Sequence, residues 1–158
     1  MLIELVAKLD AWVVQRNLEA RDKGAPTLAP CLLRLLGQSA LFEMRAPLTL
    51  AVTKDVDLQA NYAYAIEVEL RRLLKLAGME LAALGQEIWM PKETQYERVY
   101  AGEYATLEIA DMDSILLSKA LKAPRKNRSL IVEYLARGAS SRFLRLAREY
   151  ELDLEAFV

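Results

Sequence analysis

Residues 31–44 read CLLRLLGQSALFEM, and the fold expected for the whole chain follows from this stretch. Its first six residues form an apolar run of the kind that favours a buried strand. Gly37, Gln38 and Ser39 come next and lead into residues 40–44, which read as the start of a helix. The glycine therefore lies at a predicted turn from a strand into a helix.

A second strand is expected over residues 49–58, which read TLAVTKDVDL. Side chains alternate between the two faces of a strand, so Thr53, Asp55 and Asp57 fall on one face. Asn61 is placed to cap the helix that follows. A pair of carboxylates therefore comes shortly after the predicted glycine turn.

The remaining pattern alternates strand-like and helical segments that end at Gly or Pro. Strands are expected over residues 87–90, 95–100 and 105–110, and helices over 2–22, 114–122 (capped by Asp111 or Asp113), 129–137 and from Ser140 or Ser141 to about 150. This order indicates an α/β fold, a single domain over residues 1–158 with a small mixed β-sheet flanked by helices. Its parts are an N-terminal helix and loop (1–30), a core (31–110) and a helical C-terminal third (111–158).

The composition excludes several kinds of protein. The 21 basic and 22 acidic residues leave a net charge of −1, so the chain has no bulk positive charge for wrapping a nucleic acid. The chain contains no histidine, which removes Ser-His-Asp and Cys-His catalysis and zinc sites ligated by histidine. Any catalysis must therefore use carboxylates, lysine, serine, tyrosine or a metal held by oxygen ligands.

Cys31 is the only cysteine, so no disulfide can form within the chain and a reducing compartment is expected. Its place in an apolar run indicates a buried core residue rather than a nucleophile. Charged residues interrupt the first apolar segment, unlike in a signal peptide, and no stretch reaches the roughly 20 apolar residues of a membrane span. We therefore expect a cytoplasmic protein with no membrane partner.

Asp55 and Asp57 are the first candidates for chemistry. Two carboxylates at positions i and i+2 of a strand repel each other, and a divalent cation between them removes the repulsion. Mg²⁺ commonly binds through one or two carboxylates together with substrate phosphates. The alternative is that both side chains lie on a solvated strand face or in a turn, because so short a motif often occurs by chance.

A second group of candidates could hold phosphate. Free N–H groups at the helix start after Gly37 suit an anion, and the Ser39 hydroxyl can add a hydrogen bond. The alternative is a tight turn in which Ser39 caps the helix. Lys119 lies in the mostly apolar segment SILLSKAL, where its ammonium either reaches a phosphate or extends to the surface. Arg125 is one of several basic residues that follow it.

These motifs in this order, LLGQSALFEM, VTKDVDL, IADMDSILLSKAL and PRKN, resemble the DNA polymerase β-like nucleotidyltransferase superfamily. The resemblance is closest to small bacterial members, including those of toxin–antitoxin and abortive-infection systems, and it covers about residues 31–150. It implies a nucleotidyltransferase-like fold and transfer of a nucleoside monophosphate from a nucleotide triphosphate to a hydroxyl, with release of pyrophosphate. RNA and protein are the candidate acceptors.

The resemblance also implies roles for individual residues. Asp55 and Asp57 would hold two Mg²⁺ ions, Gly37, Gln38 and Ser39 would lie against the phosphates, and Lys119 with Arg125 would neutralise the triphosphate. Active relatives usually have a third carboxylate on a later strand. The candidates for it here are Glu97 in QYERVY and Glu108 in ATLEIAD.

Three functions remain open on these grounds. The first is a Mg²⁺-dependent nucleotidyltransferase. The second is a catalytically degenerate module that binds nucleotide or a cognate partner protein, as one half of a toxin–antitoxin pair. The third is an interaction protein that forms a homodimer through leucines of the C-terminal helices, including Leu130, Ile131, Leu135, Leu144 and Leu146.

Overall fold

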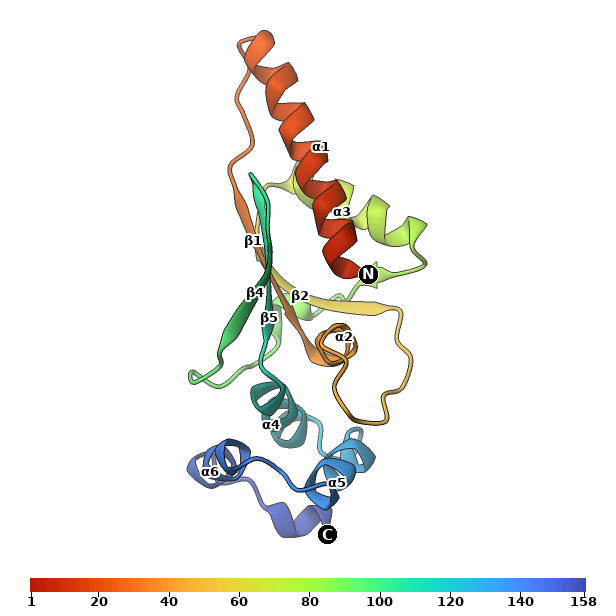
Figure 1. Ribbon diagram of the computed structural model, residues 1–158, viewed down its shortest axis with the longest axis vertical. Coiled ribbons are helices and arrows are strands. Elements are labelled where there is room, and N and C mark those ends of the chain that lie inside the picture. The colour runs from red at the N-terminus through yellow and green to blue at the C-terminus, as the bar shows by residue number, and fades with distance from the viewer.

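A five-stranded mixed sheet with helices on one face and at one end forms the protein, as seen in a computed structural model that describes residues 1–158 (Figure 1). The strand order is β3-β2-β1-β5-β4. The strands are β1 (Cys31–Leu36), β2 (Asp55–Asn61), β3 (Glu80–Leu81), β4 (Tyr96–Ala101) and β5 (Ala105–Ala110), and the helices are α1 (Leu2–Asp22), α2 (Gly37–Glu43), α3 (Tyr64–Leu76), α4 (Met112–Lys122), α5 (Arg128–Ala136) and α6 (Ser141–Glu149). The predicted α/β class and mixed sheet are therefore confirmed.

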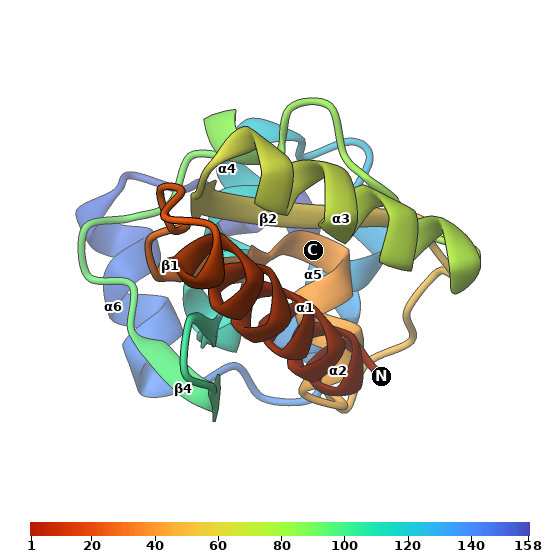
Figure 2. The same ribbon diagram turned by 90° about the horizontal axis from the view of Figure 1, so that it is seen from above.

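The apolar run over residues 31–36 forms the central strand. β1 pairs antiparallel with β2 and parallel with β5. Leu33 and Leu35 on β1 are completely buried, because α1 and α3 pack side by side over that face of the sheet (Figure 2). Cys31 is also buried and unpaired, and burial raises the pKa of its thiol to about 11. The thiol therefore stays protonated at neutral pH, as expected for a core residue.

A buried aspartate ties α1 to the turn between β4 and β5. The Asp10 carboxylate accepts hydrogen bonds from the backbone N–H groups of Glu103, Tyr104 and Ala105, at 3.2, 2.7 and 2.8 Å. Gly102 in the same turn comes so close that an added Cβ would lie 2.4 Å from the Asp10 side chain. The turn between β4 and β5 is therefore built around this one carboxylate.

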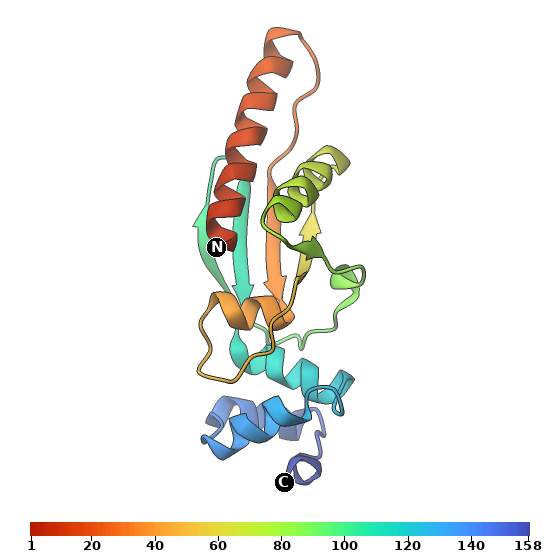
Figure 3. The same cartoon turned by 90° about the vertical axis from the view of Figure 1, so that its right-hand side faces the viewer.

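The C-terminal third forms a separate layer at the end of the sheet where β1 and β5 terminate (Figures 1 and 3). Asp111 caps α4 by accepting from the N–H of Ser114, and Ser140 caps α6 by accepting from the N–H of Phe143. Both caps agree with the prediction. Among the leucine-rich positions proposed for a dimer face, Leu130, Ile131 and Leu146 are buried in the core and only Leu144 is exposed. None of the helices combines the length and the apolar character that a membrane-spanning helix requires.

Three local predictions were wrong. β2 begins at Asp55 instead of residue 49, because β1 ends at Leu36, which pairs with Asp57, and residues before 55 have no strand partner. Asn61 ends β2 and pairs with Leu32, so α3 begins after Ala63 without an asparagine cap.

The third error concerns residues 87–90, which form no strand. The backbone there ends a short 3₁₀-helix (Gly85–Glu87) and then crosses the sheet, where the Ile88 carbonyl accepts from the Gln59 side chain. The apolar side chains of this segment suggested a strand. Instead, Ile88 and Met90 pack against the core, and the Trp89 ring contacts Tyr150 in the C-terminal third.

Candidate functional site

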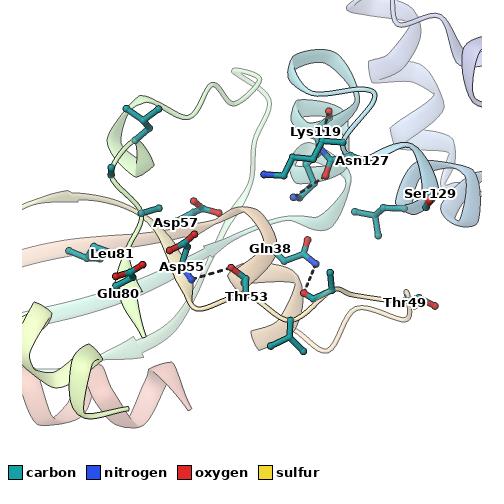
Figure 4. Close-up of a pocket in the computed structure, with 17 residues that line it drawn as sticks. Gln38, Thr49, Thr53, Asp55, Asp57, Glu80, Leu81, Lys119, Asn127 and Ser129 are labelled. Carbon is teal, nitrogen blue, oxygen red and sulfur yellow. Dashed lines mark hydrogen bonds between the residues drawn. The ribbon is translucent and has the colours of Figure 1, made fainter. Parts of the chain in front are cut away.

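A cavity of about 880 Å³ opens where the start of β2 faces the C-terminal helices. Asp55 and Asp57 enter it from β2, Gln38 enters it from α2, and Lys119 enters it from α4 (Figure 4). The structure thus brings together four of the residues that the sequence analysis selected, from segments up to about 80 positions apart. Two carboxylates and an ammonium group share one hollow surface.

The turn at Gly37 is what places Asp57 in the cavity. Gly37 has a φ of +60°, a conformation that L-residues with side chains rarely adopt. A Cβ at this position would lie 2.1 Å from Oδ2 of Asp57, 2.9 Å from its Cγ and 3.2 Å from its Cβ. Glycine is therefore required both by the backbone and by the close approach of the aspartate. The Asp57 carboxylate occupies the space that any other residue would fill.

Ser39 has a structural part in this arrangement. It is buried, its hydroxyl donates to the carbonyl of Leu36 at 3.1 Å, and the same oxygen accepts from the N–H of Asp57 at 3.2 Å. The serine thereby joins the end of β1 to the start of β2. It does not line the 880 Å³ cavity, whereas its neighbour Gln38 does.

The Asp57 carboxylate is half-buried, and burial raises its pKa above the ordinary value of 3.8. The ammonium groups of Lys119 and Lys126 lower the pKa, while the nearby Asp55 carboxylate raises it and the backbone N–H of Gln38 lowers it. The burial contribution dominates. A cation brought into the cavity would therefore stabilise a carboxylate that the fold leaves short of solvation.

Lys119 shows the reverse behaviour. Burial lowers its pKa below 10.5, Asp57 raises it, and Lys126 lowers it further. The Lys119 ammonium makes its only hydrogen bond with Oδ1 of Asn127, at 3.4 Å. The Lys119 charge is therefore balanced mainly by the Asp57 carboxylate, which does not contact it. A bound anion would stabilise the ammonium group that burial destabilises.

The rim of the cavity is a loop fixed at two points. Gln38 donates from its side-chain amide to the carbonyl of Ala51 at 3.0 Å. Two residues before Ala51, the backbone N–H of Thr49 donates to both carboxylate oxygens of Glu133 on α5, at 3.2 and 3.0 Å. The loop between α2 and β2 thus connects the sheet to the C-terminal helices beside the two aspartates.

Neither predicted third carboxylate lies at the cavity. Glu97 is exposed on β4, at the edge of the sheet opposite β3. Glu108 on β5 forms an ion pair with Arg34 at 3.0 Å, and the Arg34 guanidinium stacks over the ring of Tyr96. Both acids are thus separated from the aspartate pair by the strand order.

Glu80 is the acidic residue that sequence reasoning missed. It lies on β3, in register with Asp55 on β2, and it lines the cavity. A strand of two residues leaves almost no periodic signal, so only the parallel pairing of β3 with β2 reveals this neighbour. No group of three or more histidine, cysteine, aspartate or glutamate side chains is arranged so that it could hold a metal ion.

The basic side of the cavity also differs from expectation in its details. Lys126, Asn127 and Ser129 line it together with Lys119, whereas Arg125 does not. The consecutive residues Lys126 and Asn127 both face the cavity from the turn between α4 and α5, while the neighbouring Arg125 and Arg128 do not line it. The sequence indicated the basic segment correctly but not which of its side chains turns inward.

The chain was compared with protein-family models, with curated proteins and with solved structures, and none of them matched it.

The close packing at Gly37 predicts that Gly37→Ala destabilises the fold by about 3 kcal/mol, because a strained φ and a steric overlap act together. Gly78→Ala is the matched control, since Gly78 has a φ of +74° but nothing within 4 Å of an added Cβ. We expect the control to lose about 1 kcal/mol from backbone strain alone. Urea unfolding followed by circular dichroism measures the free energy of unfolding of both variants. Equal losses would show that the overlap with Asp57 contributes nothing to the destabilisation.

A second prediction follows from the raised pKa of Asp57. An acid whose pKa is higher in the folded state contributes stability at pH values below its unfolded pKa and loses it as pH rises through the folded pKa. Asp57→Asn should therefore be more stable than wild type at pH 7, and this advantage should vanish below pH 3.8. Asp55→Asn, at an exposed position, should change stability little. Urea unfolding across this pH range would contradict the account if Asp57→Asn were less stable than wild type at pH 7.

Proposed function

We propose that this protein is a Mg²⁺-dependent nucleotidyltransferase with a nucleotidyltransferase-like fold, whose 880 Å³ cavity binds a nucleoside triphosphate. The observation that carries the proposal is the placement of Asp55 and Asp57 opposite a half-buried Lys119 in one cavity. Carboxylates suit a divalent cation, and an ammonium group suits the phosphates that the cation accompanies. The resemblance of the motifs to the DNA polymerase β-like superfamily points to the same chemistry.

The donor set fits one Mg²⁺ ion. Asp55 and Asp57 offer carboxylate oxygens from the same face of β2, and Mg²⁺ commonly binds through one or two carboxylates and completes its shell with phosphate oxygens and water. The absence of a group of three ligands fits an ion that arrives with the nucleotide better than a permanently bound one. Glu80 lines the same cavity and adds negative charge next to Asp55 at the start of β2. When bound, the ion supplies charge stabilisation for the phosphoryl group during transfer.

The chain's own residues would position the reactants. Lys119 and Lys126 would hold the phosphates that leave, and their charges would stabilise the pyrophosphate as it separates. The acceptor hydroxyl would form a new bond to the α-phosphorus while the bond from that phosphorus to the β-bridging oxygen breaks, and the hydroxyl proton would pass to water. Such chemistry depends on positioning and electrostatics and needs no histidine.

The test is transfer of label from α-³²P nucleoside triphosphates, each supplied separately with Mg²⁺, to RNA and to protein acceptors. We expect wild type to transfer label and Asp55→Asn and Asp57→Asn each to reduce the rate by about 100-fold or more. Glu97→Gln is the matched control, because Glu97 is an exposed acid outside the cavity, and it should retain wild-type activity. Equal transfer by wild type and the aspartate variants would refute the proposal, and so would the absence of transfer with every nucleotide and acceptor.

A second candidate function is a module that binds nucleotide without turnover, in association with a cognate partner protein of a toxin–antitoxin pair. It is favoured by one observation, that Glu97 and Glu108 both lie away from the aspartate pair. Without a third acid in the expected position, the cavity would retain its basic wall for phosphates while lacking part of a catalytic centre.

Calorimetry separates the two candidates. An enzyme that uses the aspartates should bind one of ATP, GTP, CTP and UTP more tightly with Mg²⁺ than without it, and Asp57→Asn should remove the difference. A binding module should bind with micromolar affinity that neither Mg²⁺ nor Asp57→Asn changes. The second pattern would exclude the Mg²⁺-dependent mechanism.

A further inference from the structure

Asn127 lies at the N-cap position of α5, but its side chain does not cap the helix. It is the residue before α5, and asparagine there usually accepts a hydrogen bond from the first turn of the helix. No such bond is present at Asn127. Its amide nitrogen instead donates to the carbonyl of Ala123 at 2.9 Å and approaches that of Lys119 at 3.5 Å, at the end of α4.

The remaining atom of this amide contacts the cavity lysine. Oδ1 of Asn127 accepts from Nζ of Lys119 at 3.4 Å, so the asparagine holds both the backbone and the side chain of Lys119. A lysine side chain has four rotatable bonds, and keeping its ammonium in one place costs conformational entropy. Asn127 reduces that freedom before any ligand arrives. Its own position is fixed by α4, since its backbone N–H also donates to Ala123 at 3.1 Å.

The neutral charge of the amide is important for its effect. An aspartate at 127 would pair with the Lys119 ammonium and would repel an incoming phosphate. A serine could cap α5 but is too short to hold Lys119 in the same way. Asparagine therefore orients the ammonium without neutralising it, at the expense of the cap on α5.

From these contacts we infer that Asn127 is a positioning residue that presents Lys119 Nζ to a phosphate group bound in the cavity. The ligand class, a di- or triphosphate, rests on the proposed function, but the contact between the two side chains does not. Asn127 acts through Lys119, so its removal matters only while Lys119 is present. That dependence distinguishes positioning from a general contribution to folding.

The experiment is a double-mutant cycle on the binding of inorganic pyrophosphate, measured by calorimetry at neutral pH without Mg²⁺. Its members are wild type, Asn127→Ala, Lys119→Ala and the variant with both changes. Asn61→Ala is the control, because Asn61 is an exposed asparagine outside the cavity. Thermal unfolding of every variant shows whether the fold is retained, and Asn127→Ser serves as a second variant whose hydroxyl can supply the cap that α5 lacks.

We expect Asn127→Ala and Asn127→Ser to weaken pyrophosphate binding about tenfold, the loss typical of one hydrogen bond to a charged group. In the Lys119→Ala background the same change should have no further effect, and Asn61→Ala should bind as wild type does. Additive losses, or unchanged binding by both Asn127 variants, would overturn the inference. Failure of wild type to bind pyrophosphate would also overturn it, whereas loss of label transfer with the cycle intact would refute only the proposed reaction.

Discussion

The contact between the Gly37 backbone and the Asp57 carboxylate is the constraint on which the rest of the site depends. The pairing of Leu36 with Asp57 places the first turn of α2 directly against this side chain. No Cβ fits at position 37, because the Asp57 carboxylate occupies that space. The Ser39 hydroxyl fixes the backbone of Asp57 by accepting a hydrogen bond from its N–H. The tight turn and the acidic pair are therefore one structural unit.

Partial burial of the Asp57 carboxylate in this unit would destabilise the fold if no positive charge lay nearby. Asp57 is half-buried with a raised pKa, and Lys119 on the opposite wall has a lowered one, so each charge lacks part of its solvation. The Lys119 ammonium is hydrogen-bonded to Asn127 and not to Asp57. The two charges therefore face the cavity from opposite walls without forming an ion pair across it. Preorganised opposite charges separated by a hollow suit a ligand that carries both a cation and phosphates. Burial of the apolar core, which includes Leu33, Leu41 and Leu117, offsets this cost.

Much of the fold could be predicted because it depends on local signals. The apolar run before Gly37 gave β1, and the Asp111 and Ser140 caps placed α4 and α6 correctly. The errors at residues 49–54 and 87–90 arose because apolar character resembles a strand even where no partner strand exists. Whether a segment finds a partner strand depends on the tertiary structure, and the sequence of that segment alone does not reveal it.

The same distinction applies to the site. The spacing of Asp55 and Asp57 and the apolar setting of Lys119 are visible in the sequence, and the structure brings all three into one cavity. Glu80 and Asn127 were missed as site residues, since a two-residue strand and an unused helix cap show their roles only in three dimensions.

A crystal structure with Mn²⁺ and a non-hydrolysable nucleoside triphosphate would show whether the two aspartates hold a cation beside the phosphates, because Mn²⁺ has an anomalous signal and prefers the same oxygen ligands as Mg²⁺. We expect Mn²⁺ to bind the carboxylates of Asp55 and Asp57, with the phosphates against Lys119. Nucleotide bound elsewhere, or a cavity with neither ion nor nucleotide at saturating concentrations of both, would contradict this expectation.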